Sequence, residues 1–196
     1  RMIKSCQQAV TSTQFYMYGR SHFTQKGWER ARKTYSGQDL LRDPSLSLNN
    51  RIFIVTGANA GIGRCIARFL AQRGAVVYMF CRSQIRGEQA RKALSQETQS
   101  SRIHLVPCDV SLEASVRKAY ATFYDHVTTT YGAPQLHGLV CNAGALLNER
   151  TLTTEGLETT FAAHLLLGSY LLTKLCLPVL KATEEARVDN VSSGGM

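Results

Sequence analysis

Eight residues that follow a buried hydrophobic run constrain the fold of this chain more than any other feature. The run at residues 52–55 reads IFIV and is typical of a strand buried on both faces. Residues 56–63 follow it directly and read TGANAGIG, and apolar residues then recur at helical spacing up to Leu70. Three glycines between a strand and a helix let the backbone turn sharply and aim free amides at a phosphate group. The turn predicts a phosphate-binding site, although a turn of this kind can also serve packing alone.

Strand-like and helix-like segments alternate from residue 51 onward. Strands are expected at 52–55, 75–80, 103–106, 136–141 and 187–191, with helical patterns and no hairpin turns between them. Crossovers of this kind are right-handed and produce a parallel sheet. We therefore predict an α/β fold: a doubly wound, Rossmann-like parallel sheet in the order 3-2-1-4-5, which binds its ligand at the carboxyl ends of the strands.

Two helix starts and the domain limits complete this outline. A polar helix is expected over 88–96, and Asp109 and Ser111 are candidate N-caps of the helix after the third strand. Residues 1–46 are aromatic, basic and turn-rich, and they predict an extension with one or two short helices. We expect a dinucleotide-binding domain over 47–196 that is incomplete on its C-terminal side, because the fifth strand would otherwise be an uncovered edge.

More than half of the net charge of +9 comes from the first 50 residues, which hold eight basic and three acidic side chains. No acidic residue precedes Glu29, so the start of the chain is compatible with the remnant of an organelle-targeting segment. The basic residues form no dense block, and no nucleic-acid motif accompanies them. We therefore expect no nucleic-acid partner.

The six cysteines lie far apart and form no C-x-x-C pair, and no histidine lies at zinc-ligand spacing from them. Four of them sit in or beside apolar runs, where a free thiol behaves as a small hydrophobe. This pattern predicts reduced thiols and no metal site. It favours an intracellular, reducing compartment, either mitochondrial or cytoplasmic.

The most apolar stretch of the chain, residues 161–180, predicts a buried helix. It contains His164, Ser169, Lys174 and Pro178, which make a membrane span unfavourable. An apolar helix of this length also offers a surface through which two copies could form a homodimer.

The chain resembles the short-chain dehydrogenase/reductase family at four motifs that occur in the family's order. The glycine turn matches T-G-x-x-x-G-I-G, Asp109-Val110 follows the third strand, Asn142-Ala143-Gly144 the fourth and Ser192-Ser193 the fifth. Residues 23–63 and the terminal VSSGGM further resemble one branch of that family. The resemblance implies a nicotinamide dinucleotide, with its adenine at Asp109 and its nicotinamide ribose beside the N-A-G motif. The predicted cofactor-binding residues are Gly57, Asn59, Ala60, Gly61, Ile62, Gly63, Arg82, Ser83, Asp109, Val110, Asn142, Ala143 and Gly144.

The residues after the second strand favour NADP(H) over NAD(H). An NAD site usually places an acid there for the ribose 2′-hydroxyl, whereas an NADP site places a cation. This chain has Cys81-Arg82-Ser83 at that point and no acid until Glu88. The Arg82 guanidinium offers a planar donor fork suited to a phosphate dianion. The alternative is a solvated surface arginine.

The catalytic residues that the family resemblance implies are mostly absent from this chain. The family uses a Ser, a Tyr-x-x-x-Lys pair and a helix Asn, and by resemblance Ser193 takes the Ser role with Ser192 as its neighbour. The Tyr and Lys would lie beyond Met196. Tyr170 and Lys174 match their spacing, but they precede the fifth strand and are rejected. The helix Asn is replaced by His164, or by Leu165 if the count runs back from Gly168, because the segment looks one residue longer than the family pattern.

Two hypotheses about function follow. The first is an NADP(H)-dependent reductase that transfers hydride between nicotinamide and a small carbonyl or alcohol substrate, with the catalytic Tyr and Lys further along the gene product. The second is a catalytically inactive accessory subunit that docks through residues 1–46 in a larger, possibly mitochondrial membrane, assembly. Aromatic side chains such as Phe15, Tyr16 and Trp28 support that docking role, but they could also pack on their own domain. Asp189 departs from the apolar pattern of a fifth strand and needs a partner or exposure.

Overall fold

The computed structural model describes residues 2–34, 43 and 45–192, with side chains from residue 10 onward. Residues 46–192 form one compact unit, and the described part of residues 1–45 forms another. We describe each unit by itself.

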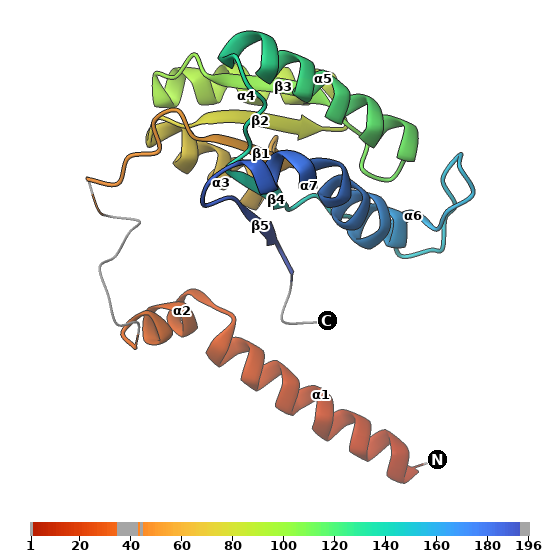
Figure 1. The fold of residues 1–196 in the computed structure, drawn as a ribbon. Coiled ribbons are helices and arrows are strands. Elements are labelled where there is room, and N and C mark those ends of the chain that lie inside the picture. The colour runs from red at the N-terminus through yellow and green to blue at the C-terminus, as the bar shows by residue number, and fades with distance from the viewer. Residues whose placement is uncertain (1, 35–42, 44, 193–196) are drawn as a thin grey trace. The chain divides into compact units, whose positions relative to one another are not determined.

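The larger unit is built on a five-stranded parallel sheet in the order β3-β2-β1-β4-β5, which confirms the predicted fold (Figure 1). Apolar side chains alternate between its two faces. In β2, for example, Tyr78 and Phe80 belong to one core cluster and Val77 and Met79 to the other. Both faces are therefore buried, as the continuous apolar runs predicted. The strands are β1 (Ile52–Thr56), β2 (Val76–Cys81), β3 (Ile103–Pro107), β4 (Gly138–Cys141) and β5 (Arg187–Asn190).

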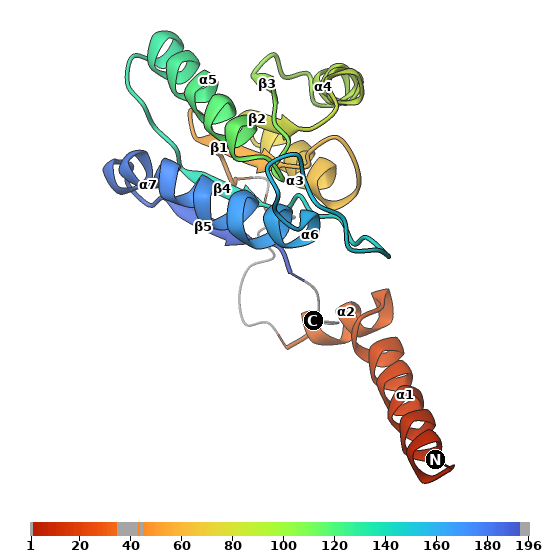
Figure 2. The same cartoon turned by 90° about the vertical axis from the view of Figure 1, so that its right-hand side faces the viewer.

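Helices cover both faces of this sheet (Figure 2). On one face lie α3 (Gly61–Gln72) and α4 (Gln84–Thr98). On the other lie α5 (Glu113–Tyr131) and a long helical segment made of α6 (Thr159–Phe161), η1 (Ala162–Leu171) and α7 (Leu172–Ala182). Because all five strands are parallel, their carboxyl ends and the loops that follow them lie at the same end of the sheet.

Two helix starts differ from the sequence prediction. Helix α4 begins at Gln84, four residues before the predicted start, because the Ser83 hydroxyl caps it by accepting a hydrogen bond from the Arg86 amide at 3.4 Å. Helix α5 is not capped by Asp109 or Ser111. Its first amides, those of Glu113 and Ala114, donate instead to the Glu155 carboxylate at 2.6 and 3.1 Å.

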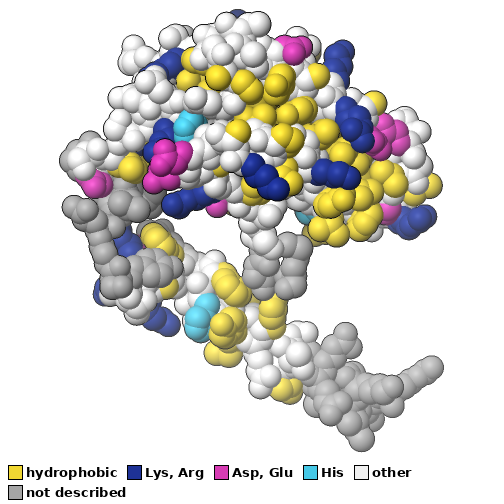
Figure 3. Space-filling view, in the orientation of Figure 1, with side chains coloured by type: hydrophobic (Ala, Val, Ile, Leu, Met, Phe, Trp, Pro, Cys, Tyr) yellow, Lys and Arg dark blue, Asp and Glu magenta, His cyan; other side chains and the backbone are white. Residues whose placement is uncertain are grey.

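The apolar stretch forms a helix that packs on the sheet, and its middle part, η1, is a π-helix. Its inward side chains Leu167, Leu171, Leu172 and Cys176 belong to the core. Within the described residues, Thr159–Ala182 is long and apolar enough to cross a membrane by length and composition, and just under half of its most apolar window is buried in the domain. The outer side of η1 and α7 leaves hydrophobic side chains exposed, among them Leu165 and Tyr170 (Figure 3).

Strand β5 lies at the edge of the sheet, and all four of its residues are exposed. The Asp189 carboxylate is therefore exposed to solvent, so it does not need the charged or hydrogen-bonding partner that a buried carboxylate would require.

The smaller unit contains two helices, α1 (Met2–His22) and α2 (Gln25–Arg32). Thr24 is the N-cap of α2, and its hydroxyl oxygen accepts a hydrogen bond from the Gly27 amide at 3.5 Å. Helix α1 is 21 residues long, so it is not the short helix that the sequence predicted. Its aromatic side chains are exposed within this unit, and Tyr18 stacks on His22 with ring centroids 3.9 Å apart.

Candidate functional site

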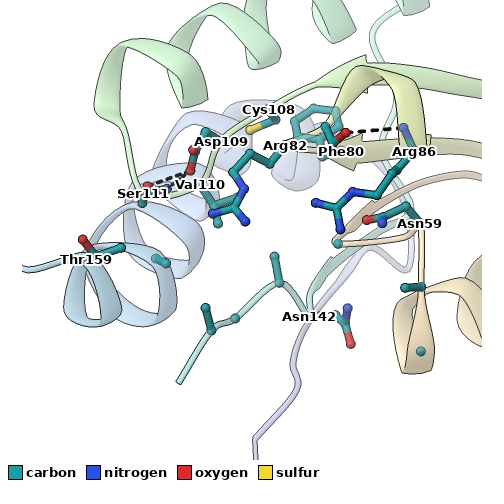
Figure 4. A pocket seen from close by; sticks show the side chains of 18 residues that line it. Asn59, Phe80, Arg82, Arg86, Cys108, Asp109, Val110, Ser111, Asn142 and Thr159 are labelled. Carbon is teal, nitrogen blue, oxygen red and sulfur yellow. Dashed lines mark hydrogen bonds between the residues drawn. The ribbon is translucent and has the colours of Figure 1, made fainter. Parts of the chain in front are cut away.

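A cavity of about 370 Å³ opens at the carboxyl ends of the strands of the larger unit (Figure 4). The segments around it come from the ends of β1, β2, β3 and β4 and from the start of the long apolar helix. It therefore lies where a doubly wound sheet is expected to bind its ligand. The residues that line it are Gly57, Asn59, Ala60, Gly61, Phe80, Arg82, Ser83, Arg86, Cys108, Asp109, Val110, Ser111, Asn142, Ala143, Gly144, Ala145, Thr159 and Ala163.

Two glycines of the turn have separate tasks. Gly61 begins α3 with φ +54°, and a Cβ placed on it would meet nothing within 4 Å, so open space lies in front of the helix start. Gly63, two residues further along, is buried, and a Cβ placed on it would lie 2.5 Å from the side-chain amide nitrogen of Asn142 and 2.6 Å from the Gly57 carbonyl oxygen. Gly61 thus supplies a left-handed backbone, and Gly63 lets the helix approach the strand closely.

The start of α3 is suited to an anion. Its N-cap residue, Ala60, has no side-chain oxygen, and no described side chain caps this helix. The first amides of a helix have no intrahelical partner and carry the positive end of the helix dipole. Because these amides border the open space at Gly61, a phosphate can bind there.

The hydroxyl of Thr56, at the end of β1, fixes the loop that follows β4. Its oxygen accepts hydrogen bonds from the amides of Asn142 and Ala143, each at 2.9 Å, and Thr56 is only 1% exposed. The Asn142 side chain donates in return to the Thr56 carbonyl oxygen at 2.9 Å. These three bonds join two strand ends that are 86 residues apart in sequence.

Two arginine side chains enter the cavity from the end of β2 and the start of α4. Figure 4 shows both guanidinium groups in the cavity, that of Arg86 beside Asn59 and that of Arg82 nearer to Val110 and Asp109. Both side chains are exposed, and neither forms an ion pair with any residue that the structure describes. Two cations without partners leave a positive region at this end of the cavity, which favours an anionic ligand.

Asp109 follows β3 and lines the same cavity, on the side toward which Arg82 points (Figure 4). One of its carboxylate oxygens, Oδ1, accepts from the Ser111 amide at 3.0 Å and from the Ser111 hydroxyl at 2.7 Å. Its own amide donates to the Ser115 hydroxyl at 2.8 Å. Its other carboxylate oxygen has no hydrogen-bond partner among the described residues, so it can accept from a ligand.

Most of the predicted cofactor-binding residues meet at this cavity, and two, Ile62 and Gly63, do not line it. Ile62, the second residue of α3, is 64% exposed and is not among the residues that line the cavity. Gly63 supports the turn from behind. Ser193, the predicted catalytic serine, lies outside the described residues. Sequence reasoning missed Arg86, although it follows Arg82 by four residues, because the helix was expected to start after it. The other lining residues that were not predicted are Phe80, Cys108, Ser111, Ala145, Thr159 and Ala163.

Tyr170 and Lys174 lie outside this cavity. Both are exposed, and the Lys174 ammonium lies 5.9 Å from the centroid of the Tyr170 ring. They line a separate groove on the outer surface of the long helix, together with Leu165 and Asn190. Their match to the family's Tyr-x-x-x-Lys spacing therefore has no structural counterpart in the site.

The thiols near the cavity are not nucleophiles. Burial raises the pKa of Cys108 to about 12 and that of Cys81 to about 11, so both remain protonated at neutral pH. Cys141 and Cys176 are also buried free thiols. Among the described residues, no group of His, Cys, Asp or Glu could hold a metal ion. The described part of the site therefore offers binding groups for an anionic ligand rather than a nucleophile or a metal.

Comparisons with known proteins agree with this geometry. The sequence model of the short chain dehydrogenase family matches residues 51–195. Dehydrogenase/reductase SDR family member 12 from Bos taurus is 37% identical over 185 residues, which cover 94% of this chain and 55% of that protein. The chain thus spans about half the length of this relative. The relative also confirms the branch of the family that residues 23–63 resemble.

Solved structures of the same fold include an uncharacterized protein from Mycobacterium paratuberculosis, 30% identical with a TM-score of 0.64 over 81% of this chain and 51% of that chain. A 3-ketoacyl-(acyl-carrier-protein) reductase from Brucella melitensis, solved in complex with NADH, is 25% identical with a TM-score of 0.54 and covers 69% of this chain and 52% of that one. Sequence, fold and cavity agree: the chain belongs to the short-chain dehydrogenase/reductase family, whose members are oxidoreductases that bind a nicotinamide dinucleotide.

Proposed function

We propose that this domain binds NADP(H) in preference to NAD(H). The observation that carries the proposal is the pair of arginines, Arg82 and Arg86, that enter the cavity without an ion-pair partner in the described chain. The two cofactors differ only by a phosphate on the adenosine ribose, so a site that prefers NADP(H) needs cationic donors for that phosphate. Two guanidinium groups meet that need, and no acidic residue occurs between β2 and Glu88 to bind the 2′-hydroxyl of NAD(H).

The remaining cavity fits the other parts of the dinucleotide. The uncapped start of α3, with open space at Gly61, suits the pyrophosphate. The Asp109 carboxylate can accept from the adenine amino group, as the family resemblance implies. When bound, the nicotinamide would supply hydride transfer to a carbonyl or from an alcohol. The residues of this chain would bind and orient it.

We further propose that the pocket serves a reductase acting on a small carbonyl or alcohol. By resemblance Ser193 would hold the substrate oxygen, and a Tyr-x-x-x-Lys pair further along the gene product would exchange the proton. The relatives that support this proposal are about twice as long as the chain. The inactive accessory subunit is the competing outcome. A longer gene product that binds NADPH but does not oxidise it with any of a panel of aldehydes and ketones would favour that outcome.

Titration of the full chain with NADPH and with NADH tests the cofactor proposal. Arg82→Ala and Arg86→Ala should each weaken NADPH binding about tenfold, the value of one charge-assisted contact, and should leave NADH binding unchanged. Arg68→Ala is the matched control, because it removes the same charge from an exposed residue of α3 outside the cavity. Equal affinity of the wild type for NADPH and NADH would refute the preference, as would an equal loss in the control.

A further inference from the structure

One side chain from η1 holds the end of the loop that follows β4. The Nε2 atom of His164 lies 2.7 Å from the backbone nitrogen of Ala145 and 3.0 Å from its carbonyl oxygen. With Nε2 unprotonated, the ring accepts from the amide, and with a proton on Nε2 it donates to the carbonyl oxygen. Both neutral tautomers therefore bind the same residue of the loop.

The ring also packs against the backbone just before that residue. A Cβ placed on Gly144 would lie 2.7 Å from the Cε1 atom of His164, so only a glycine lets the imidazole come this close. The next residue of the helix, Leu165, is 59% exposed and lines the outer groove instead. Of the two residues that could replace the family's helix Asn, His164 and not Leu165 thus contacts the loop after β4.

The π-helix is what places His164 there. In a π-helix each hydrogen bond spans five residues rather than four, which widens the turn. The Ser169 hydroxyl donates to the His164 carbonyl oxygen, five residues back, at 2.7 Å. A Cβ on Gly168 would overlap the carbonyl oxygen of Ala163, so glycine is required where the wide turn closes. Wide turns of this kind occur frequently at functional sites.

We propose that His164 is a positioning residue that shapes the loop Asn142–Ala145 to receive the second nucleoside of the dinucleotide, an inference that rests on the proposed binding of NADP(H). Figure 4 shows Arg82 and Arg86 on one side of the cavity and Asn142 on the other. With the 2′-phosphate at the arginines and the pyrophosphate at the start of α3, the second nucleoside extends toward the loop after β4. Thr56 binds the first part of that loop, and His164 binds its end.

Three substitutions at this position separate the role of the hydrogen bond from that of packing. His164→Leu removes the ring nitrogens and keeps an apolar side chain. His164→Gln places an amide near the position of Nε2, whereas His164→Asn places one near Nδ1, which is too short to reach Ala145. The matched control is His137→Leu. His137 also accepts from a backbone amide, that of Ile52 at 3.0 Å, but at the amino end of β1, away from the cavity.

Two probes and one exchange measurement on the full chain test the proposal. NADPH reaches the loop after β4, whereas adenosine 2′,5′-bisphosphate ends at the pyrophosphate site. His164→Leu and His164→Asn should weaken NADPH binding about fivefold to tenfold, leave the bisphosphate unchanged and speed amide hydrogen exchange at Ala145. His164→Gln should restore both the affinity and the protection, and His137→Leu should bind both probes as the wild type does.

The outcomes distinguish this inference from the function on which it rests. A wild-type chain that binds neither probe overturns the proposed binding of NADP(H), and with it this role. A wild-type chain that binds both probes, with unchanged NADPH affinity in His164→Leu, overturns the role of His164 alone. Equal weakening of both probes, or a His164→Gln variant that behaves like His164→Leu, also overturns it. Exchange at Ala145 is compared with exchange at amides of the core strands, so that local loss of this bond is distinguished from a general loss of stability.

Discussion

The hydroxyl of Thr56 binds two backbone amides of the loop after β4, and its removal gives the most specific prediction. Thr56→Val keeps the shape of the side chain and deletes the oxygen that accepts from the amides of Asn142 and Ala143. Each amide left without a partner costs about 1–3 kcal/mol if water cannot reach it. Both residues are half-buried, so we expect a loss of about 2–4 kcal/mol of unfolding free energy. NADPH binding should fall at least about tenfold, because the loop loses its attachment to β1.

Substitution of two other threonines by valine makes the same chemical change elsewhere in the domain and serves as a control. The Thr183 hydroxyl accepts from the Leu136 amide at 3.1 Å in the core, away from the cavity, so Thr183→Val should cost about 1–3 kcal/mol and leave NADPH binding unchanged. The Thr128 hydroxyl donates to the Tyr124 carbonyl oxygen on the exposed side of α5, so Thr128→Val should change stability by less than about 0.5 kcal/mol.

Urea unfolding followed by far-UV circular dichroism measures these losses. Circular dichroism is preferred to tryptophan fluorescence, because the single tryptophan, Trp28, lies in α2 of the smaller unit. Cofactor affinity is measured separately by titration with NADPH under native conditions. If Thr56→Val lost no more stability than Thr128→Val, or bound NADPH as tightly as Thr183→Val, the attachment of the loop through this hydroxyl would be refuted.

Two further predictions concern stability. Glu155→Ala should lower the free energy of unfolding in urea by about 1 kcal/mol, because it removes the carboxylate that caps the first amides of α5. Glu149→Ala changes an exposed glutamate without such a contact, so it should leave the free energy of unfolding unchanged. Equal effects of the two substitutions would contradict the cap. Burial, helped by the positive charges of His126 and Arg91, lowers the pKa of His104 to about 4. The unfolded chain therefore takes up a proton below about pH 6.5 that the folded chain does not, so stability should fall as the pH drops from about 6.5 to 4. His104→Phe should lose less stability than the wild type between neutral pH and about pH 5 in the same assay, and an identical loss would exclude this role.

The inner strands of the sheet could be predicted from the sequence because they are continuous apolar runs, whereas β5 is exposed and contains Arg187, Asp189 and Asn190. A strand buried on both faces has no polar alternation to obscure it, and Ile52–Thr56 and Val76–Cys81 carry that signal strongly. The glycine turn could be predicted for a similar reason. The turn needs glycines at particular positions of the backbone, and these positions all lie within residues 56–63, so the local sequence is enough to predict it.

Contacts between distant residues could not be predicted in this way. The cap of α5 comes from Glu155, more than 40 residues after the helix start, and nothing local distinguishes that glutamate from other exposed ones. Asp109 had the right type for a cap, but its carboxylate turns back to Ser111. The place of His164 depended on the number of residues in each helical turn, which the apolar pattern of this segment does not reveal.

The π-helix also has a consequence for how this domain tolerates changes in length. In an α-helix each added residue rotates everything after it by about 100°. Such a rotation after Leu171 would turn Leu172 and Cys176 away from the sheet and bring exposed side chains such as Lys174 toward it. A wide turn can hold an extra residue without passing that rotation on. The segment Ala162–Leu171 can therefore gain or lose a residue beside the site while the helix that follows keeps its face on the core.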